Sequence, residues 1–328
     1  KVAEKERNKR LIAWNYRMLN EDYATEWIKH ETRKEELETV GAPIHPQACA
    51  EREREKYTKL LSEEPVETDN LEEWMEKAGI KREEGAPKEP RVDPTGWRLK
   101  RNMVKQKKKA GGADGWRASE MAKLPTKWFA MLAEIWNECL KQGRVPKIWT
   151  HIRMVGIPTN DGTGAKRGLG IATLAWRIGM TDLIAAHKHW IGEWLDEDIT
   201  SGPGRSVEDL LDNLLSDEAE AREEGEEFSG VKIDLSKYFD RCTPERCIKM
   251  LEKLGANKGF TEVIRSFYDQ VTLYAECQGA VAKEPIERKR GLLQGCPASV
   301  LLAIIEQHGW IKYVKKQAPE VKICAYVD

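Results

Sequence analysis

The sequence predicts a mixed α+β fold, and three observations support this prediction. Several segments have the length and the apolar spacing of helices, among them 126–142 and 297–317. Two short runs, 230–235 and 321–328, are apolar or alternate as strands do. Asp234 and Asp328 stand at the ends of these two runs. Mixed elements with a carboxylate at the end of each of two strands fit an α+β domain.

The first 84 residues are interpreted as an irregular, charged helical extension. Their apolar periodicity is loose, and the aromatic residues that could anchor them are sparse: Trp14, Tyr23, Trp27, Tyr57 and Trp74. The next segment, 85–96, reads GAPKEPRVDPTG, and its prolines and glycines interrupt both helix and strand. We therefore expect a linker there. A chain of 328 residues suggests about two folding units on length alone.

A basic helix is expected after the linker, at 98–109, followed by a glycine-rich turn at 110–115. A second helix is predicted over 126–142, because Gly143 is a typical helix stop. The next expected element is a hairpin, with a strand at 152–158, a turn NDGTG and a return segment at 166–174.

The second half continues with alternating elements. Helices are expected near 176–195, 207–224, 244–254, 261–270 and 297–317, with a strand pair around 271–285. The apolar run 230–235 is bounded by glycine and charge, which predicts a buried strand. In 321–328 the residues Val321, Ile323, Ala325 and Val327 alternate as in a strand.

Charge is unevenly distributed, although the formal net charge is only −1. From Trp97 to Pro158 there are 14 Lys and Arg against 4 Asp and Glu, a surplus of ten positive charges, whereas 208–227 is strongly acidic. This pattern indicates either a polyanionic partner on one face or two solvated helix faces, and charge alone does not separate them. No apolar run of about 18 residues and no signal peptide is present, so neither a membrane nor secretion is indicated.

The seven cysteines contain no CxxC pair, which favours reduced thiols in an intracellular protein.

Asp234 and Asp328 are candidate metal ligands. Two carboxylates on neighbouring strand ends can hold two Mg²⁺ ions about 3.5–4 Å apart, which activate a hydroxyl and stabilise a leaving pyrophosphate. Aspartate is also a common turn former at strand ends, so the pair alone leaves both interpretations open.

The order of several motifs resolves that ambiguity. The chain carries KKAGGADGW, VPKIWTHIRMVGIP, KRGLGI, SGPGRSVEDLL, DLSKYFD, RGLLQGCPAS and AYVD in this order. From about residue 97 to 328 it thereby resembles the reverse transcriptases of non-LTR retrotransposons and, more distantly, those of group II introns. Ordered context is what gives short motifs their specificity. The resemblance implies right-hand polymerase fingers over 97–205 and an incomplete palm over 206–328, with the thumb absent.

The resemblance also assigns roles. Asp234 and Asp328, with the Leu235 carbonyl, would hold two Mg²⁺ ions, and Mn²⁺ is an alternative. Phe239 would exclude a 2′-hydroxyl from the incoming nucleotide, and Asp240 would orient the turn. Nucleotide contacts are implied for Arg167, Gln294 and Gly295. The basic helix would bind nucleic acid through Arg98, Lys100, Arg101, Lys105, Lys107, Lys108 and Lys109.

The implied activity is RNA-directed DNA polymerisation, with an RNA template, a DNA primer or target and dNTPs as partners. Departures from the family pattern are Thr159, where a lysine is usual, Gly168 in place of a proline, and Val300 in place of another. Lys166 could substitute for the missing lysine. The sequence ends before the second aspartate of the Tyr-x-Asp-Asp motif, so we expect little polymerase activity from this chain alone.

The alternative is a degenerate, retroelement-derived nucleic-acid-binding module. A maturase-like splicing cofactor is poorly supported. A nuclear location would follow only from the type of element.

Overall fold

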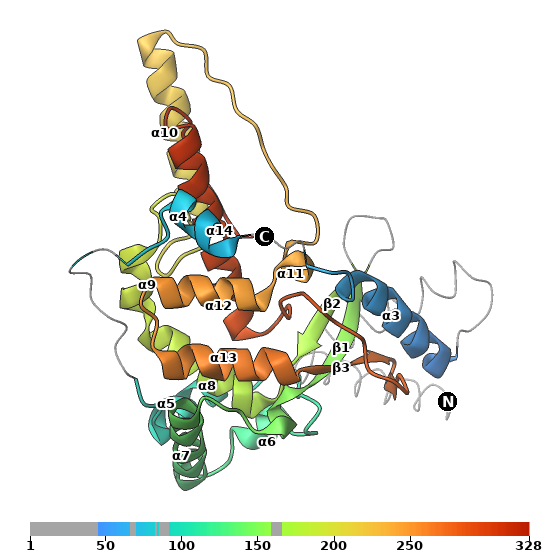
Figure 1. Cartoon of the computed structure of the whole chain (residues 1–328). Coiled ribbons are helices and arrows are strands. Elements are labelled where there is room, and N and C mark those ends of the chain that lie inside the picture. The colour runs from blue at the N-terminus through green and yellow to red at the C-terminus, as the bar shows by residue number, and fades with distance from the viewer. Residues whose placement is uncertain (1–44, 66–69, 83, 85–91, 159–165, 328) are drawn as a thin grey trace, which may run out of the picture.

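The computed structural model describes residues 45–65, 70–82, 84, 92–158 and 166–327 (Figure 1). One mixed sheet of four strands lies in this part of the chain, in the order β2–β1–β3–β4. Strand β1 (His151–Pro158) runs antiparallel to β2 (Lys166–Ile171) and parallel to β3 (Thr272–Cys277), which pairs with the short β4 (Ala280–Val281). The predicted hairpin and the predicted strand pair are therefore confirmed, and the hairpin turn lies outside the described residues.

Four helices pack against one another and enclose an aromatic core: α5 (Gly96–Lys105), α7 (Thr126–Gln142), α8 (Leu174–Ala186) and α13 (Lys258–Gln270). The rings of Trp136 and Trp176 stack with 5.5 Å between centroids, and Phe267 stacks on Trp176 at 3.8 Å. Gly179 of α8 lies against the Trp136 ring. A Cβ at this position would lie 2.0 Å from the indole, so there is no room for a side chain. This core fixes α8 against α7.

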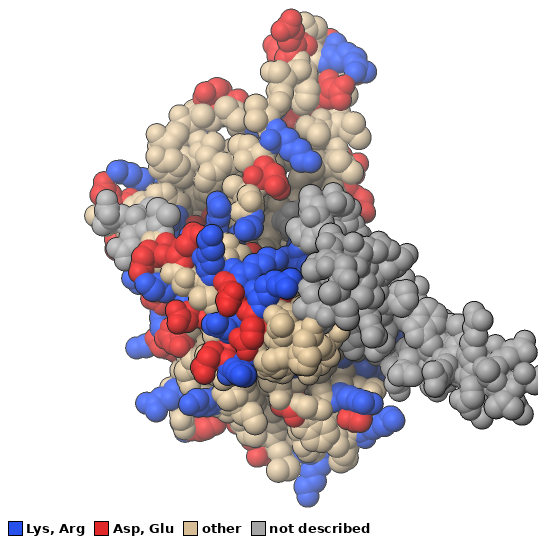
Figure 2. Space-filling model, turned by 90° about the vertical axis from the view of Figure 1, so that its right-hand side faces the viewer, with Lys and Arg blue, Asp and Glu red and all other residues tan. Residues whose placement is uncertain are grey.

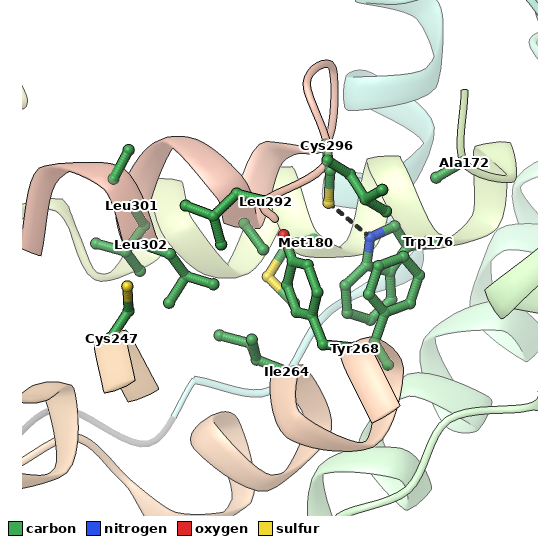
Figure 3. Close-up of a cluster of buried hydrophobic side chains, with 14 of the residues drawn as sticks. Ala172, Trp176, Met180, Cys247, Ile264, Tyr268, Leu292, Cys296, Leu301 and Leu302 are labelled. Carbon is green, nitrogen blue, oxygen red and sulfur yellow. Dashed lines mark hydrogen bonds between the residues drawn. The ribbon is translucent and has the colours of Figure 1, made fainter. Parts of the chain in front are cut away.

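A second part of the core lies beneath α14 (Pro297–Gln317), beside α12 (Pro244–Lys253) (Figure 3). The indole Nε1 of Trp176 donates to Cys296 Sγ at 3.2 Å, and Tyr268 and Ser299 share a hydrogen bond of 2.6 Å. Leu292 points into the same cluster. The loop that precedes α14 is thus anchored from below by buried side chains.

The N-terminal helices α3 (Pro46–Leu61) and α4 (Leu71–Ala78) contribute to the same core. A disulfide joins Cys49 of α3 to Cys277 of β3, with Cα atoms 5.9 Å apart. The expectation of reduced thiols is therefore wrong for this pair. No local pattern predicts this pair, since the two cysteines are 228 residues apart. Among the described residues the other cysteines are free, and four of them are buried.

Several predicted boundaries are confirmed. Helix α7 ends at Gly143, which is left-handed with φ 66°, as its αL cap requires. Helix α10 (Val207–Glu224) and α14 occupy the predicted ranges, and α12 and α13 do so within a few residues. The helix expected over 176–195 is divided at His187 into α8 and α9 (Lys188–Trp194). The shorter elements are α6 (Ala118–Met121), the 3-10 turn Lys147–Thr150 and α11 (Tyr238–Arg241).

Two predicted strands are not formed. Residues 230–235 lie in an exposed, irregular segment that runs from α10, which projects from the body, back to α11 (Figure 1). Val231 is 87% exposed, so the prediction of a buried strand there is wrong. Residues 321–327 form only one bridge, between Ala325 and Ile199. An apolar run becomes a strand only where a neighbour pairs with its backbone, and among the described residues none lies beside 230–235.

None of the described helices is long and apolar enough to span a membrane.

Candidate active site

Three segments that are distant in sequence meet at one edge of the sheet: β2, α11 and the loop before α14. The amide of Gly170 in β2 donates to the Gln294 carbonyl at 2.8 Å. On the other side of the same loop, the Leu292 amide donates to the Phe239 carbonyl at 2.7 Å. These backbone bonds hold the segments with Arg167, Phe239 and Gln294 together. The segments that carry the residues for which the resemblance implied nucleotide contacts are therefore adjacent.

Gly295 lies where the loop before α14 passes close to β2. Its φ is +94°, a conformation that residues other than glycine rarely adopt. A Cβ on Gly295 would lie 2.7 Å from Leu169 Cδ1 and 3.2 Å from the Gly170 carbonyl oxygen. The close approach of the loop to β2 thus depends on glycine at this position.

Asp240 is the buried polar centre of the cluster and is only 9% exposed. Burial raises the pKa of Asp240, and this effect is opposed by the positive charges of Lys237 and Arg167 and by a hydrogen bond from the Gln294 amide. The Asp240 carboxyl group therefore lies within electrostatic range of Arg167 on β2 and next to the Gln294 side chain of the loop. The expectation that Asp240 orients the turn stays a prediction.

Phe239 lies in the short helix α11 and is half-buried. The helix begins after Lys237, whose φ is +54°. The neighbouring Tyr238 fixes the turn, since its hydroxyl donates to the Ala303 carbonyl of α14 at 2.8 Å. The Phe239 ring meets the Tyr238 ring edge to face, with centroids 6.0 Å apart. The aromatic pair is thereby held on α14.

The candidate metal ligands Asp234 and Leu235 do not belong to the cluster around Asp240. Asp234 is exposed in the irregular segment before α11, and Leu235 is 52% exposed. Asp328 lies outside the described residues. Within the described part of the chain, no group of three or more His, Cys, Asp or Glu side chains is placed to hold a metal ion. Carboxylate and carbonyl oxygens are the donors that Mg²⁺ prefers, so the chemistry of Asp234 and Leu235 fits that ion.

The chain that leads to position 328 is held in place by the loop after α9. The Ala325 carbonyl accepts hydrogen bonds from the Thr200 amide at 2.9 Å and from its hydroxyl at 3.1 Å. The Ala325 amide donates to the Asp198 carbonyl at 2.8 Å. Lys322 forms ion pairs with Asp217 and Glu220 of α10. These contacts fix the backbone up to Val327, which is buried.

The basic residues of α5 and the following turn divide into two groups. Arg98 forms an ion pair with the buried Asp182 at 2.7 Å, Lys100 donates to Thr126, and Arg101 stacks on the Trp97 ring at 4.8 Å. The exposed group comprises Lys105, Lys107, Lys108 and Lys109. Arg98, one of the residues for which nucleic-acid binding was implied, is thus engaged by Asp182 within the protein.

The face that carries α3 shows Lys and Arg side chains beside acidic ones (Figure 2). Lys166 pairs with Glu53 at 3.6 Å, and Lys289 and Arg290 pair with Glu64 and Glu63. Thus Lys166, which could have substituted for a phosphate-binding lysine, is engaged by α3. Among the departures from the family pattern, Thr159 lies outside the described residues and Val300 is exposed on α14.

Two contributors to the cluster were not among the predicted site residues. Tyr57 comes from the N-terminal extension, where it was named only as a possible anchor, and Arg290 is the first residue of RGLLQGCPAS. Both are buried, and Asp240 lies within electrostatic range of the Arg290 guanidinium and of the neutral Tyr57 hydroxyl. Only the folded arrangement of α3 against the loop brings them to this position.

A comparison with protein-family models agrees with this geometry. The model of the reverse transcriptase (RNA-dependent DNA polymerase) family matches residues 146–328, which is more than half of the chain. The match contains β1, β2, α11, the Gln294 loop and the C-terminal segment. The chain therefore belongs to the reverse transcriptase family, and its matched region is an RNA-directed DNA polymerase domain.

Proposed function

We propose that this chain supplies the nucleotide pocket and the first catalytic aspartate of a retroelement reverse transcriptase of the non-LTR type. The enzyme adds dNTPs to a primer 3′-hydroxyl on an RNA template. The observation that carries the proposal is the convergence of β2, α11 and the Gln294 loop around Asp240. In the right-hand architecture of polymerases, residues 97–205 would form the fingers and residues 206–328 part of the palm.

Each pocket residue has a role that its position supports. Arg167 is exposed on β2, and its guanidinium binds the triphosphate through charge-assisted hydrogen bonds. The Gln294 amide is oriented by Asp240, and Gly295 allows the backbone to approach the nucleotide closely. The Phe239 ring, fixed by its neighbour Tyr238, occupies the space that a 2′-hydroxyl would need.

Asp234 and Asp328, with the Leu235 carbonyl, would hold two Mg²⁺ ions, or Mn²⁺. When bound, such ions lower the pKa of the primer hydroxyl and stabilise the charge on the leaving pyrophosphate. Asp234 now lies in an exposed segment without a strand partner among the described residues. Assembly of the site therefore requires ordering of 230–235, and we expect little polymerase activity from the chain alone.

The proposal is tested with a primed RNA template whose DNA primer ends in a dideoxynucleotide, so that dTTP binds without reacting. In Mg²⁺, dTTP should stabilise the complex of this chain with the template. Arg167→Ala or Gln294→Ala should weaken dTTP binding by about tenfold, the effect of one lost charge-assisted contact. Lys105→Ala is the matched control, since it should weaken RNA binding and leave dTTP affinity unchanged. An equal dTTP response in all four proteins would refute the pocket.

One observation favours a second candidate, a nucleic-acid-binding module without polymerase activity: the segment that carries Asp234 is not ordered into a sheet. This candidate predicts that the chain binds the primed RNA through the exposed lysines Lys105 and Lys107–Lys109 and shows no dTTP response.

A further inference from the structure

Helix α3 lies outside the region that matches the reverse transcriptase family, yet it contacts the segments that flank the pocket. At its N-terminal end, the Gln47 amide donates to the Val281 carbonyl at 3.0 Å, and Glu51 accepts from the Lys283 amide at 2.8 Å. At its C-terminal end, the Leu61 carbonyl accepts from the Lys289 amide at 2.8 Å. The helix therefore spans from the β3–β4 hairpin to the Gln294 loop.

The middle of α3 presses on β2 through Tyr57, which is 2% exposed. A Cβ at Gly168 would lie 2.8 and 2.9 Å from two ring carbons of Tyr57 and 2.6 Å from Met154 Cε. Gly168 has no positive φ that would call for glycine, and it sits within β2 opposite Gly156. Glycine is therefore needed at position 168 for space, and the Tyr57 ring fills that space.

The contact has a direct relation to the pocket. Gly168 is the residue after Arg167, so a shift of β2 at this point moves the guanidinium. Tyr57 also lies near Asp240, whose negative charge adds to burial and to Glu53 in raising the pKa of Tyr57.

A second contact of the same kind exists nearby, where a Cβ on Gly291 would lie 2.8 Å from Leu61. Helix α3 thus packs on two glycines, on Gly168 through Tyr57 and on Gly291 through Leu61.

The ring of Tyr57, rather than its hydroxyl, makes this contact. The Tyr57 hydroxyl oxygen is buried, and no described residue forms a hydrogen bond with it. Replacing Tyr57 by Phe should therefore preserve the contact, whereas replacing it by Ala should open the space beside Gly168.

We infer that α3 is a positioning element of the nucleotide pocket. Tyr57 and Gly168 are a matched pair that sets how closely β2, and with it Arg167, approaches Asp240 and Gln294. The inference rests on the proposed function, because it assigns α3 a part in dNTP binding. It also explains why the proline usual in the family is absent at 168: a side chain there would collide with the Tyr57 ring.

The test is a double-mutant cycle with Gly168→Ala, Tyr57→Ala and the combination, and with Tyr57→Phe as control. Two quantities are measured in the full chain: the melting temperature, and the dTTP affinity in the complex with the dideoxy-terminated primer on RNA. Gly168→Ala should weaken dTTP binding by about tenfold, because overpacking displaces β2. Adding Tyr57→Ala should restore most of the affinity, and Tyr57→Phe should match the unmodified chain.

Three results would overturn the inference. The first is a loss of dTTP affinity in Gly168→Ala that is the same with and without Tyr57→Ala. The second is coupling of the two positions in melting temperature with no change in dTTP affinity, which would make the pair merely structural. The third is the absence of dTTP binding by the unmodified chain, which would refute the proposed function itself and would still leave the thermal coupling measurable. If Gly168→Ala does not fold, Tyr57→Leu replaces it: removal of the ring beside an unchanged Gly168 should weaken dTTP binding, and an unchanged dTTP affinity would overturn the inference.

Discussion

Arg98 is expected to be a structural residue, and its replacement by Met tests this. Its guanidinium reaches Asp182 with Nε 3.1 and 3.0 Å from the two carboxylate oxygens and with Nη2 at 2.7 Å from one of them. Asp182 is 3% exposed, and its other donor is Asn102 Nδ2 at 3.3 Å. In Arg98→Met the apolar stem is kept, and the buried carboxylate loses its partner.

The cost follows from the burial of the two groups. Breaking a buried ion pair by removing one partner typically costs about 3–5 kcal/mol. The Arg98 side chain is 27% exposed, so water screens part of the interaction, and we expect the lower end, about 3 kcal/mol. For a chain of this size that corresponds to a melting temperature lower by about 5 °C.

The assay is urea unfolding followed by circular dichroism, in parallel with binding of single-stranded RNA. Lys105→Met, on the same helix and exposed, should change stability by less than about 0.5 kcal/mol. Arg98→Met combined with Asp182→Leu should regain most of the lost stability, since no charge is then left buried. The reasoning is refuted if Arg98→Met is as stable as the unmodified chain and loses RNA affinity instead.

Three further predictions concern the pocket, a buried histidine and the core. Phe239→Ala should admit UTP beside dTTP in the complex on primed RNA, and unchanged discrimination would remove the role given to that ring. Burial lowers the pKa of His308 to about 4 from its ordinary 6.5. As the pH falls, His308 is therefore protonated in the unfolded chain at a higher pH than in the folded chain. The stability that the neutral side chain contributes above pH 6.5 is lost towards pH 4. Urea unfolding should show a loss of about 2 kcal/mol from this group between pH 7 and 5, which His308→Gln should abolish; an equal pH slope in the variant would contradict this. Gly179→Ala should lower stability by about 3 kcal/mol, because its methyl group collides with Trp136; Trp136→Leu should relieve part of this cost, and the absence of such relief would contradict the packing.

Helices were predictable because their signals are local. Gly143 ends α7 in a left-handed conformation, and Ser206 with Asp209 forms a capping box at the start of α10. The β1–β2 hairpin was equally clear, since its strands and turn are adjacent in sequence. Signals of this kind depend on a few neighbouring residues and not on tertiary contacts.

Strands and pairings that depend on distant partners were not predictable. The run 230–235 has a strand's composition, yet no described strand pairs with it, and it is exposed. The disulfide between Cys49 and Cys277 and the ion pair of Arg98 with Asp182 join residues far apart in sequence. Charge and spacing show which groups exist and not which of them meet in the fold.

The residues proposed to bind the nucleotide were chosen from motif order, and the structure brings together the segments that carry Arg167, Phe239 and Gln294. What motif order could not show is how these segments are held. Asp240 lies buried among them, and Tyr57 packs on β2 from a helix outside the family match. Both act through tertiary contacts that leave no periodic or spacing signal.

The central claim is that Asp234 is a catalytic aspartate of an RNA-directed DNA polymerase. The most direct measurement is extension of a DNA primer on an RNA template with dNTPs and Mg²⁺, by the longest reading frame that contains this chain. The account predicts extension by the unmodified protein and none by Asp234→Asn, with affinity for the primed template unchanged. Extension by Asp234→Asn at the rate of the unmodified protein would contradict it.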